Sequence, residues 1–141
     1  MQPFDLAAVM AVERSAYSLP WSEKAMSDCL AGPYTCEVVS GNGELVAHMI
    51  TQQVLDELHL INLCVSRAHQ RQGIGLLLIQ HLLDSGRRSD ARQVFLEVRR
   101  SNQAALQLYR GMGFEAIGTR RDYYRDKQGH EDAVVMALSL P

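Results

Sequence analysis

Apolar spacing and helix-capping residues predict two helices at the start of the chain. Apolar side chains recur at about the helical period over residues 5–16, and Asp5 stands where an N-cap residue is expected. Pro20 restricts the residue before it to an extended backbone. Because serine favours the N-cap position, we expect a second helix that begins after Ser22 and runs to about Leu30.

Short apolar runs then predict three strands. Residues 35–39 and 45–54 are typical of strands, and they flank the glycine-rich turn Gly41-Asn42-Gly43. A turn of this composition favours an antiparallel hairpin. A third strand is expected over residues 58–65.

Helices and strands alternate in the second half of the chain. A polar segment, 66–72, precedes a predicted helix over 73–85. Leucines cover much of the circumference of this helix, so we expect it to be largely buried. An apolar strand over 94–98 contains one carboxylate, and Ser101-Asn102 can cap a helix that runs through Tyr109.

Two further strands complete the pattern. They are expected over residues 114–119 and 133–138, joined by a polar, aromatic connection over 120–132. Hairpins followed by alternating strands and helices indicate an α/β fold with a mixed sheet, part antiparallel and part parallel. At 141 residues, with 47% hydrophobic and 21% charged residues, the chain has the size and composition of one globular domain over 1–141.

Charge and cysteine content argue against several classes of protein. The formal net charge of -2 and the pI near 6.2 give no global electrostatic reason to bind nucleic acid or an anionic membrane. The longest strongly apolar run, residues 74–79, is too short to cross a bilayer. Three cysteines without C-x-x-C spacing, in a chain that does not begin with a secretory signal, predict a reducing, cytoplasmic environment.

The turn Gln70-Arg71-Gln72-Gly73-Ile74-Gly75 carries the strongest local signal. It lies between a predicted strand and a predicted helix, so unpaired N–H groups at the helix start point outward while the glycines permit close approach. The helix dipole and Arg71 both favour an anion there, which indicates a phosphate or pyrophosphate ligand. A dinucleotide fingerprint needs a third glycine where Leu78 stands, and a simple tight turn remains an alternative.

Two sets of residues resemble a known family. The pattern Q-x-x-G-x-G at 70–75 is the first, and the second lies downstream: Asn102, Ala105, Tyr109, Gly113 and Phe114. Together they resemble the GNAT superfamily of acyl-CoA N-acyltransferases, over nearly the whole chain. Four segments make the chain similar to the members that acetylate the N-terminal alanine of a ribosomal protein: Pro20-Trp21-Ser22-Glu23, Leu96-Glu97-Val98-Arg99, Arg120-Arg121-Asp122-Tyr123-Tyr124 and Glu131-Asp132-Ala133.

The resemblance implies where acetyl-CoA binds. The sheet would be splayed between the family's fourth and fifth strands, here 58–65 and 94–98, with the pantetheine arm inserted between them. The first strand of many relatives is in doubt, because residues 1–4 are too short for a good one. The positions expected to bind the cofactor are Leu63, Cys64, Val65, Arg71, Gln72, Gly73, Ile74, Gly75, Leu76 and Asn102.

Two side chains are candidates for the proton transfers. An α-amino group has a pKa near 8 and must lose a proton to attack a thioester, so a general base is required. Glu97 is the one charged residue in its apolar run and is the candidate base, although it can instead face solvent or pair with Arg99. Tyr109, seven residues after Asn102 and so on the same helix face, is the candidate acid at the CoA sulfur; otherwise it is a packed aromatic.

Other chemistry has less support. Cys64 invites a covalent acetyl-enzyme, but no local motif places a histidine beside it, so we expect a small packed residue. No histidine has zinc-like spacing with the cysteines, so no metal is expected. A main-chain N–H near Val65 is the expected oxyanion donor.

The acceptor is the least determined part. Trp21, Tyr123 and Tyr124 are expected to wall an acceptor groove, or else to pack in the core and in a hairpin. The resemblance implies a peptide amino terminus, most narrowly the N-terminal alanine of small-subunit ribosomal protein eighteen. A lysine side chain, a small-molecule amine and a non-catalytic acetyl-CoA-binding role are the alternatives.

Overall fold

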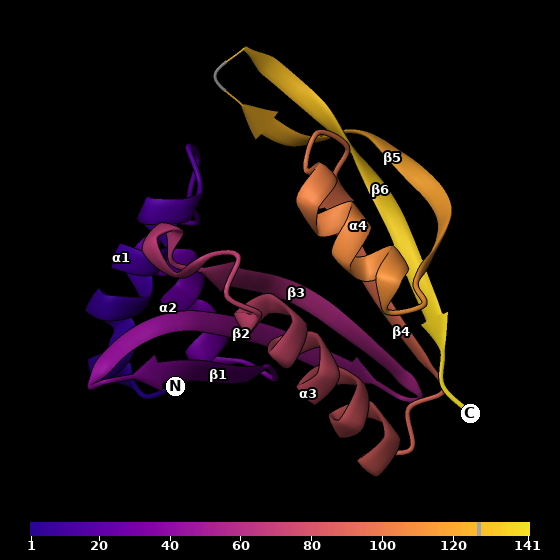
Figure 1. The fold of residues 1–141 in the computed structure, drawn as a ribbon, viewed down its shortest axis with the longest axis horizontal. Coiled ribbons are helices and arrows are strands. Elements are labelled where there is room, and N and C mark those ends of the chain that lie inside the picture. The colour runs from indigo at the N-terminus through magenta and orange to yellow at the C-terminus, as the bar shows by residue number, and fades with distance from the viewer. Residues whose placement is uncertain (127) are drawn as a thin grey trace. The chain divides into compact units, whose positions relative to one another are not determined.

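The computed structural model describes residues 1–126 and 128–141. Within these residues six strands form one mixed sheet, in the order β1-β2-β3-β4-β6-β5 (Figure 1). The strands are β1 (Thr35–Gly41), β2 (Glu44–Val54), β3 (Glu57–Val65), β4 (Gln93–Arg99), β5 (Glu115–Asp126) and β6 (Gly129–Ser139). The helices are α1 (Leu6–Ala16), α2 (Glu23–Ala31), α3 (Ile74–Arg88) and α4 (Gln103–Gly111), with the short 3₁₀ helices η1 (Pro3–Asp5) and η2 (Arg67–His69).

Backbone contacts divide the chain into two compact units. Unit 1 comprises Met1–Gln52 and Ile61–Leu78, and unit 2 comprises Gln53–Leu60 and Ile79–Pro141. Both β3 and α3 contribute residues to each unit. The single domain expected from length and composition therefore stays a prediction. In the described part of the chain, no helix combines the length and apolarity needed to traverse a lipid bilayer.

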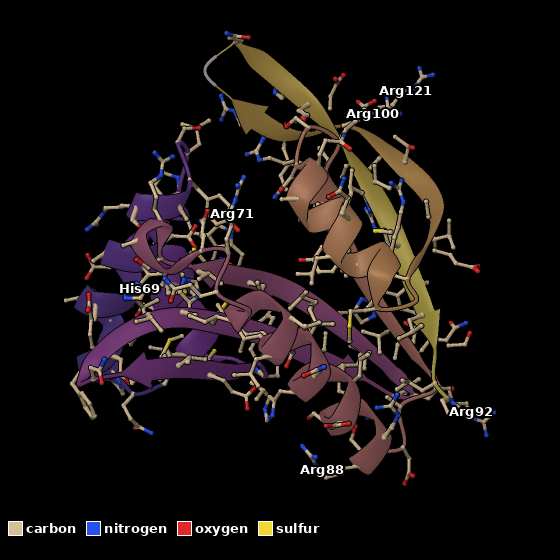
Figure 2. All side chains as sticks on the ribbon, in the orientation of Figure 1. His69, Arg71, Arg88, Arg92, Arg100 and Arg121 are labelled. Atoms are coloured by element: carbon tan, nitrogen blue, oxygen red, sulfur yellow. The ribbon has the colours of Figure 1, made fainter. Side chains whose placement is uncertain are left out.

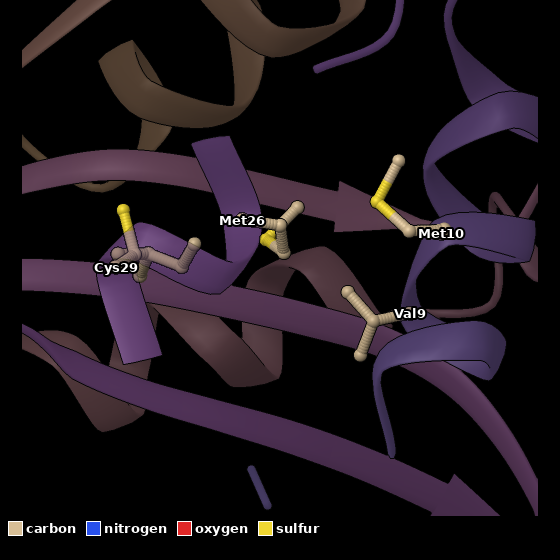
Figure 3. Close-up of a cluster of buried hydrophobic side chains, with 5 residues drawn as sticks. Val9, Met10, Met26 and Cys29 are labelled. Atoms are coloured by element: carbon tan, nitrogen blue, oxygen red, sulfur yellow. The ribbon is translucent and has the colours of Figure 1, made fainter. Parts of the chain in front are cut away.

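The core of unit 1 forms where the first two helices meet β2. Val9 and Met10 of α1 and Met26 and Cys29 of α2 converge with Ile50 of β2 (Figure 3). Val9 and Met10, two of the apolar positions that predicted the first helix, are buried on one face of α1. Trp21 is partly buried against this cluster.

The structure confirms one of the two N-caps predicted for the first two helices. The Ser22 side chain accepts a hydrogen bond from the Ala25 N–H at 3.0 Å, which confirms the predicted cap of α2. The Asp5 prediction is wrong in its detail, because Asp5 makes no side-chain cap bond to α1 and instead accepts the Gln2 N–H at 2.7 Å. The residue closes the η1 turn that precedes the helix.

The prediction that α3 is largely buried is wrong in part. Leu78, Ile79, Leu82 and Leu83 are buried, which accounts for one helix face. Leu76 and Leu77 in the first turn are 40% and 56% exposed. The first turn of α3, which follows the glycine turn, therefore exposes leucines that composition alone predicted to be buried.

Strand pairing in unit 2 sets the positions of the candidate catalytic groups. β3 pairs in parallel with β4 from Glu57↔Gln93 to Leu60↔Leu96, and β4 pairs antiparallel with β6 along its whole length. The recorded β3–β4 register ends at Leu60, whereas β4 continues to Arg99. Counted in this chain, whose described residues before Thr35 form no strand, the family's fourth and fifth strands are β3 and β4.

The predicted connection over 120–132 is wrong for most of its length. β5 continues to Asp126 and β6 begins at Gly129, so the two strands form a long hairpin; Lys127 lies outside the described residues. β5 bulges between Arg120 and Tyr124, where it advances four residues while β6 moves only from Ala133 to Glu131. Asp122 has a positive φ of 53° in this bulge, and its N–H donates to Asp132 Oδ1 at 3.0 Å.

Candidate functional site

The turn before α3 has an open backbone at the start of a long helix. Arg71 and Gly73 adopt left-handed conformations, with φ of 63° and 84°. A Cβ added to Gly73 would meet nothing within 4 Å, so the space next to this glycine is free. Gln70 Nε2 donates to the Val65 carbonyl at 3.1 Å and attaches the turn to the end of β3. Arg71 is exposed on the same turn (Figure 2), so charge and first-turn N–H groups are both available to an anion.

The end of β3 already makes several hydrogen bonds within unit 1. The Leu63 carbonyl accepts the Tyr17 hydroxyl at 2.8 Å, and the Ser66 N–H donates to the Val46 carbonyl at 2.8 Å. The Ser66 N–H is therefore occupied, which leaves the N–H groups before it as candidates for the predicted oxyanion donor near Val65. A carbonyl has two lone pairs, so Leu63 can still accept a second donor.

Glu97 lies in a polar environment rather than in an apolar one. Its Oε1 is 2.7 Å from Arg120 Nε, and its side chain is 23% exposed. Burial, and next the interaction with the same carboxylate, raise the pKa of the Tyr123 hydroxyl. The alternative pairing with Arg99 is wrong, because Arg99 Nη1 contacts Glu131 Oε1 at 3.3 Å. The candidate base is therefore a partly exposed carboxylate paired with Arg120, and not a carboxylate enclosed by apolar side chains.

Tyr109 is both a packed aromatic and a protected hydroxyl. The residue is 7% exposed, and its ring meets Phe114 edge-on at a centroid distance of 5.9 Å. Burial raises the pKa of Tyr109 to about 12, so the hydroxyl keeps its proton at neutral pH. Among the described residues this hydroxyl has no hydrogen-bond partner. Asn102 Oδ1 caps α4 by accepting the Ala105 N–H at 3.2 Å, which leaves the Asn102 amide NH₂ for other contacts.

The two tyrosines of β5 differ in their contacts. The Tyr124 hydroxyl donates to the Glu97 carbonyl at 3.0 Å, and the Arg99 guanidinium lies 4.5 Å from the centre of the Tyr124 ring. Tyr124 therefore packs within the hairpin, as the alternative reading expected. Tyr123 is 51% exposed and meets Tyr124 edge-on at 5.0 Å. Exposure and contact with the Glu97 carboxylate make Tyr123 the better candidate for touching an acceptor.

A buried polar cluster in unit 1 centres on Glu13. Its Oε2 accepts the Trp21 N–H at 3.0 Å, its Oε1 accepts Asn62 Nδ2 at 3.1 Å, and His48 Nε2 lies 3.4 Å from the same Oε1. Burial alone would raise the pKa of Glu13, but the nearby His48 imidazole and the hydrogen bonds from Trp21 and Asn62 outweigh it and hold the pKa below its ordinary value. The carboxylate is therefore ionised at neutral pH.

The structure places a histidine beside Cys64, which sequence spacing did not reveal. Ligand atoms of Glu13, His48 and Cys64 lie within 4.8 Å of one another. Both Glu13 oxygens accept N–H donors, however, and the Cys64 thiol contacts the Val12 carbonyl at 3.7 Å. Burial, and secondarily the Glu13 charge, raise the pKa of Cys64 far above its usual range, so the thiol is a poor nucleophile. The group is a hydrogen-bonded polar cluster rather than a nucleophilic dyad.

Comparison with known proteins assigns the family. Residues 6–114 match the model of the family described as Acetyltransferase (GNAT) family. The chain belongs to the GNAT acetyltransferase family. Similar proteins include the [ribosomal protein bS18]-alanine N-acetyltransferase of Escherichia coli K12, 40% identical over 99% of this chain and 95% of that protein. The protein of the same name in Haemophilus ducreyi is 34% identical over 96% and 94%.

A solved structure supports the assignment. The crystal structure of the ribosomal-protein-S18-alanine N-acetyltransferase from E. coli superposes with a TM-score of 0.92, at 40% identity, and covers 99% of this chain and 90% of that one. The predicted α/β GNAT fold is thus confirmed, and the chain is an N-acetyltransferase of this family.

The residues of this GNAT acetyltransferase suit the donor that the family uses, acetyl-CoA. In the 70–75 turn, two residues have a left-handed backbone conformation and the space next to Gly73 is open. The turn also leads into the N-terminus of a 15-residue helix. These are the features that a pyrophosphate requires. The individual cofactor positions remain predictions.

Glu13 and Arg120 contact residues of the candidate site, and neither was predicted from the sequence. Glu13 lies four residues after Val9 and therefore on the same, buried face of the first helix. A charged residue on that face could have indicated a buried polar contact. Arg120 fell in a segment predicted as a connection, where no register linked it to Glu97. A correct prediction of the β5–β6 hairpin would have brought Arg120 next to β4.

Proposed function

We propose that this GNAT acetyltransferase transfers the acetyl group of acetyl-CoA to the N-terminal α-amine of a protein, with the N-terminal alanine of ribosomal protein bS18 as the acceptor. The names of the similar proteins and the near-complete coverage of their length support this acceptor. The observation that carries the chemistry is the partly exposed Glu97 carboxylate, held between Arg120 and Tyr123. It is an anionic site that a terminal ammonium group can enter.

The charges around Glu97 favour an exchange of cations. The Arg120 side chain is 59% exposed, whereas that of Glu97 is 23% exposed. The guanidinium can therefore return to water while the carboxylate stays in place. An acceptor ammonium group takes the position of Arg120, and Glu97 removes a proton from it, directly or through one water molecule.

The neutral amine nitrogen then attacks the thioester carbonyl, the new C–N bond forms, and the C–S bond breaks. Tyr109 is protonated at neutral pH and donates its O–H toward the sulfur as negative charge develops there. A main-chain N–H at the end of β3, near Val65, faces the developing oxyanion. The amine nitrogen passes its second proton through water to the departing thiolate, Glu97 releases the first proton to solvent, and the products are the N-acetylated peptide and CoA as its thiol.

The remaining predicted positions complete the proposed site. Leu63, Cys64 and Val65 offer backbone groups to the pantetheine arm, with the Cys64 side chain turned into the buried cluster. Residues 71–76 hold the pyrophosphate, and the free amide group of Asn102 contacts the donor. Trp21 and Tyr123 are the proposed contacts of the acceptor peptide, and Tyr124 supports Tyr123 from within the hairpin.

The test uses three versions of one peptide that carries the bS18 amino terminus. The first has a free α-amine, the second has a blocked α-amine and an internal lysine, and the third begins with a residue other than alanine. We expect acetylation of the first, at its α-amine, as located by mass spectrometry. Acetylation of the lysine in the blocked peptide would instead assign a side-chain acceptor and overturn the proposal.

The roles are tested with matched variants. Glu97→Gln is expected to lower kcat at neutral pH by about 10²-fold or more and to leave the Kd for acetyl-CoA nearly unchanged, because the side chain keeps its size but loses its basicity. Glu115→Gln makes the same chemical change at an exposed position of β5 and is expected to have no effect. Equal activity of the two variants would refute the assignment of Glu97.

A further inference from the structure

A carboxylate is buried in the interior of unit 1. Among the described residues four polar or charged side chains are buried, and three of them meet at Glu13, which is 1% exposed: Glu13 itself, His48 and Asn62. Removing a charge from water is costly unless hydrogen bonds replace the lost hydration. The contacts of Glu13 therefore indicate what this charge stabilises.

Each partner of Glu13 comes from a different segment. The Trp21 N–H belongs to the connection between α1 and α2, Asn62 belongs to β3, and His48 belongs to β2. Glu13 itself belongs to α1. One carboxylate thus joins α1 to the connection that follows it and to two strands much later in the sequence.

The connection between α1 and α2 is attached to β3 at a second point nearby. Tyr17, at the end of α1, donates its hydroxyl to the carbonyl of Leu63, the residue after Asn62. Trp21 directly precedes Ser22, the N-cap of α2. The Glu13 carboxylate therefore fixes the backbone of Trp21 just before the helix begins, and fixes it relative to residues 62 and 63.

We propose that Glu13 is a positioning residue for the acceptor side of the site: it holds the Trp21 backbone in a fixed relation to residues 62–63 of β3, which adjoin the predicted cofactor-binding segment. This inference rests on the proposed function, because Trp21 is assigned there to the acceptor peptide. Glu13 touches no reacting atom. Its effect on the reaction passes through the connection that carries Trp21.

The chemistry of the cluster explains why the residue is a carboxylate. Both oxygens must accept hydrogen bonds from N–H donors, one from Trp21 and one from Asn62. A glutamine has one acceptor oxygen and one donor NH₂, so its NH₂ would face one of these donors. An aspartate keeps both acceptors but shortens the reach by one methylene. Glu13→Gln therefore tests the charge and the number of acceptors at constant size, and Glu13→Asp tests the side-chain length at constant charge.

The first measurement is steady-state kinetics of Glu13→Gln, with Glu13→Asp as the conservative variant. We expect Glu13→Gln to raise the KM for the acceptor peptide by about tenfold or more, as the loss of a hydrogen bond to a charged group implies, with kcat and the Kd for acetyl-CoA within about threefold. Glu13→Asp should lie closer to wild type. Glu23→Gln, an exposed change of the same kind on α2, is the matched control.

The second measurement does not depend on the acceptor. Trp21 is the one tryptophan of the chain, so its fluorescence reports directly on the connection. Time-resolved anisotropy of the free enzyme should show faster local motion of Trp21 in Glu13→Gln than in wild type or Glu23→Gln. Unchanged Trp21 motion overturns the inference, whichever acceptor the enzyme uses.

The kinetic outcomes are also decisive. If Glu13→Gln changes the acceptor KM no more than the donor Kd, and lowers the melting temperature, Glu13 stabilises the fold without positioning the acceptor side, and the inference is wrong. If Glu13→Gln does not fold, Glu13→Asp is compared with wild type by the same two measurements and the same criteria. Failure of wild type to acetylate any α-amine would refute the proposed function, while the anisotropy result would still test the attachment of Trp21.

Discussion

Replacement of Tyr109 by phenylalanine tests the role of a single hydroxyl. Tyr109→Phe keeps the ring that packs against Phe114 and removes only the O–H. Because burial raises the pKa of Tyr109 to about 12, the phenol binds its proton more tightly than an alkyl thiol such as cysteine does, whose pKa is about 8.5. The hydroxyl therefore stabilises the leaving sulfur chiefly as a hydrogen-bond donor and does not surrender its proton completely.

The expected loss of activity follows from that comparison. General acid catalysis contributes about 10²- to 10⁴-fold, and each decade corresponds to about 1.4 kcal/mol of activation free energy. A thiolate is already a fair leaving group, so we expect the lower end for Tyr109→Phe, a fall in kcat of about 10²-fold or about 2.7 kcal/mol. The Kd for acetyl-CoA should change by less than about threefold, because the hydroxyl contributes mainly when charge develops on sulfur.

Stability provides the internal control for Tyr109→Phe. The residue is 7% exposed and its hydroxyl makes no hydrogen bond to another described residue, so removal of the hydroxyl should change the melting temperature little. Single-turnover kinetics with saturating acetyl-CoA, together with a thermal melt, measure both quantities. A kcat within about threefold of wild type in a folded variant that binds acetyl-CoA normally would refute the role of Tyr109.

Three further substitutions test other parts of the structure. Cys64→Ala should retain turnover within about threefold, and intact-mass analysis of wild type after acetyl-CoA treatment should show no acetyl adduct, because burial raises the thiol pKa and opposes a covalent route. Gly73→Ala should weaken acetyl-CoA binding in calorimetry and cost about 1 kcal/mol of stability, because φ is 84° there. The folded-state pKa of Glu13 lies below its ordinary value of 4.5, so its ionised form stabilises the fold above that pH and loses the effect as pH falls through the lowered pKa. The difference in unfolding free energy between wild type and Glu13→Gln, measured with urea, should therefore narrow in acid; a constant difference would contradict the assigned shift.

The parts of the fold that could be predicted are those encoded locally. Ser22 and Asn102 cap their helices as expected, because an N-cap bond spans only three residues. The Asn42-Gly43 turn of the first hairpin has positive φ at both residues, which its sequence favours. The extent of β5 and β6 could not be predicted, since charged and aromatic residues hide the alternation and the pairing is not local.

The candidate site shows the same division. The glycine turn could be recognised because its backbone conformation depends on residues that are adjacent in the sequence. The sequence offered Arg99 only as an alternative partner of Glu97, and Arg120 was missed because only the antiparallel register of β4, β6 and β5 brings it within 2.7 Å. Likewise, no spacing in the sequence indicates that Glu13, His48 and Asn62 meet, since they come from three segments.

The bulge between Arg120 and Tyr124 has a consequence for how new acceptor preferences can arise. Side chains alternate between the two faces of a strand, so a one-residue change in the length of β5 would normally invert every position beyond it. The bulge already takes up two extra residues of β5, and it is here that Arg120 and Tyr123 approach Glu97. Insertions or deletions at this point can redirect those side chains while β6 keeps its register with β4. This segment is therefore the natural target for libraries that seek altered substrate selection in an unaltered sheet.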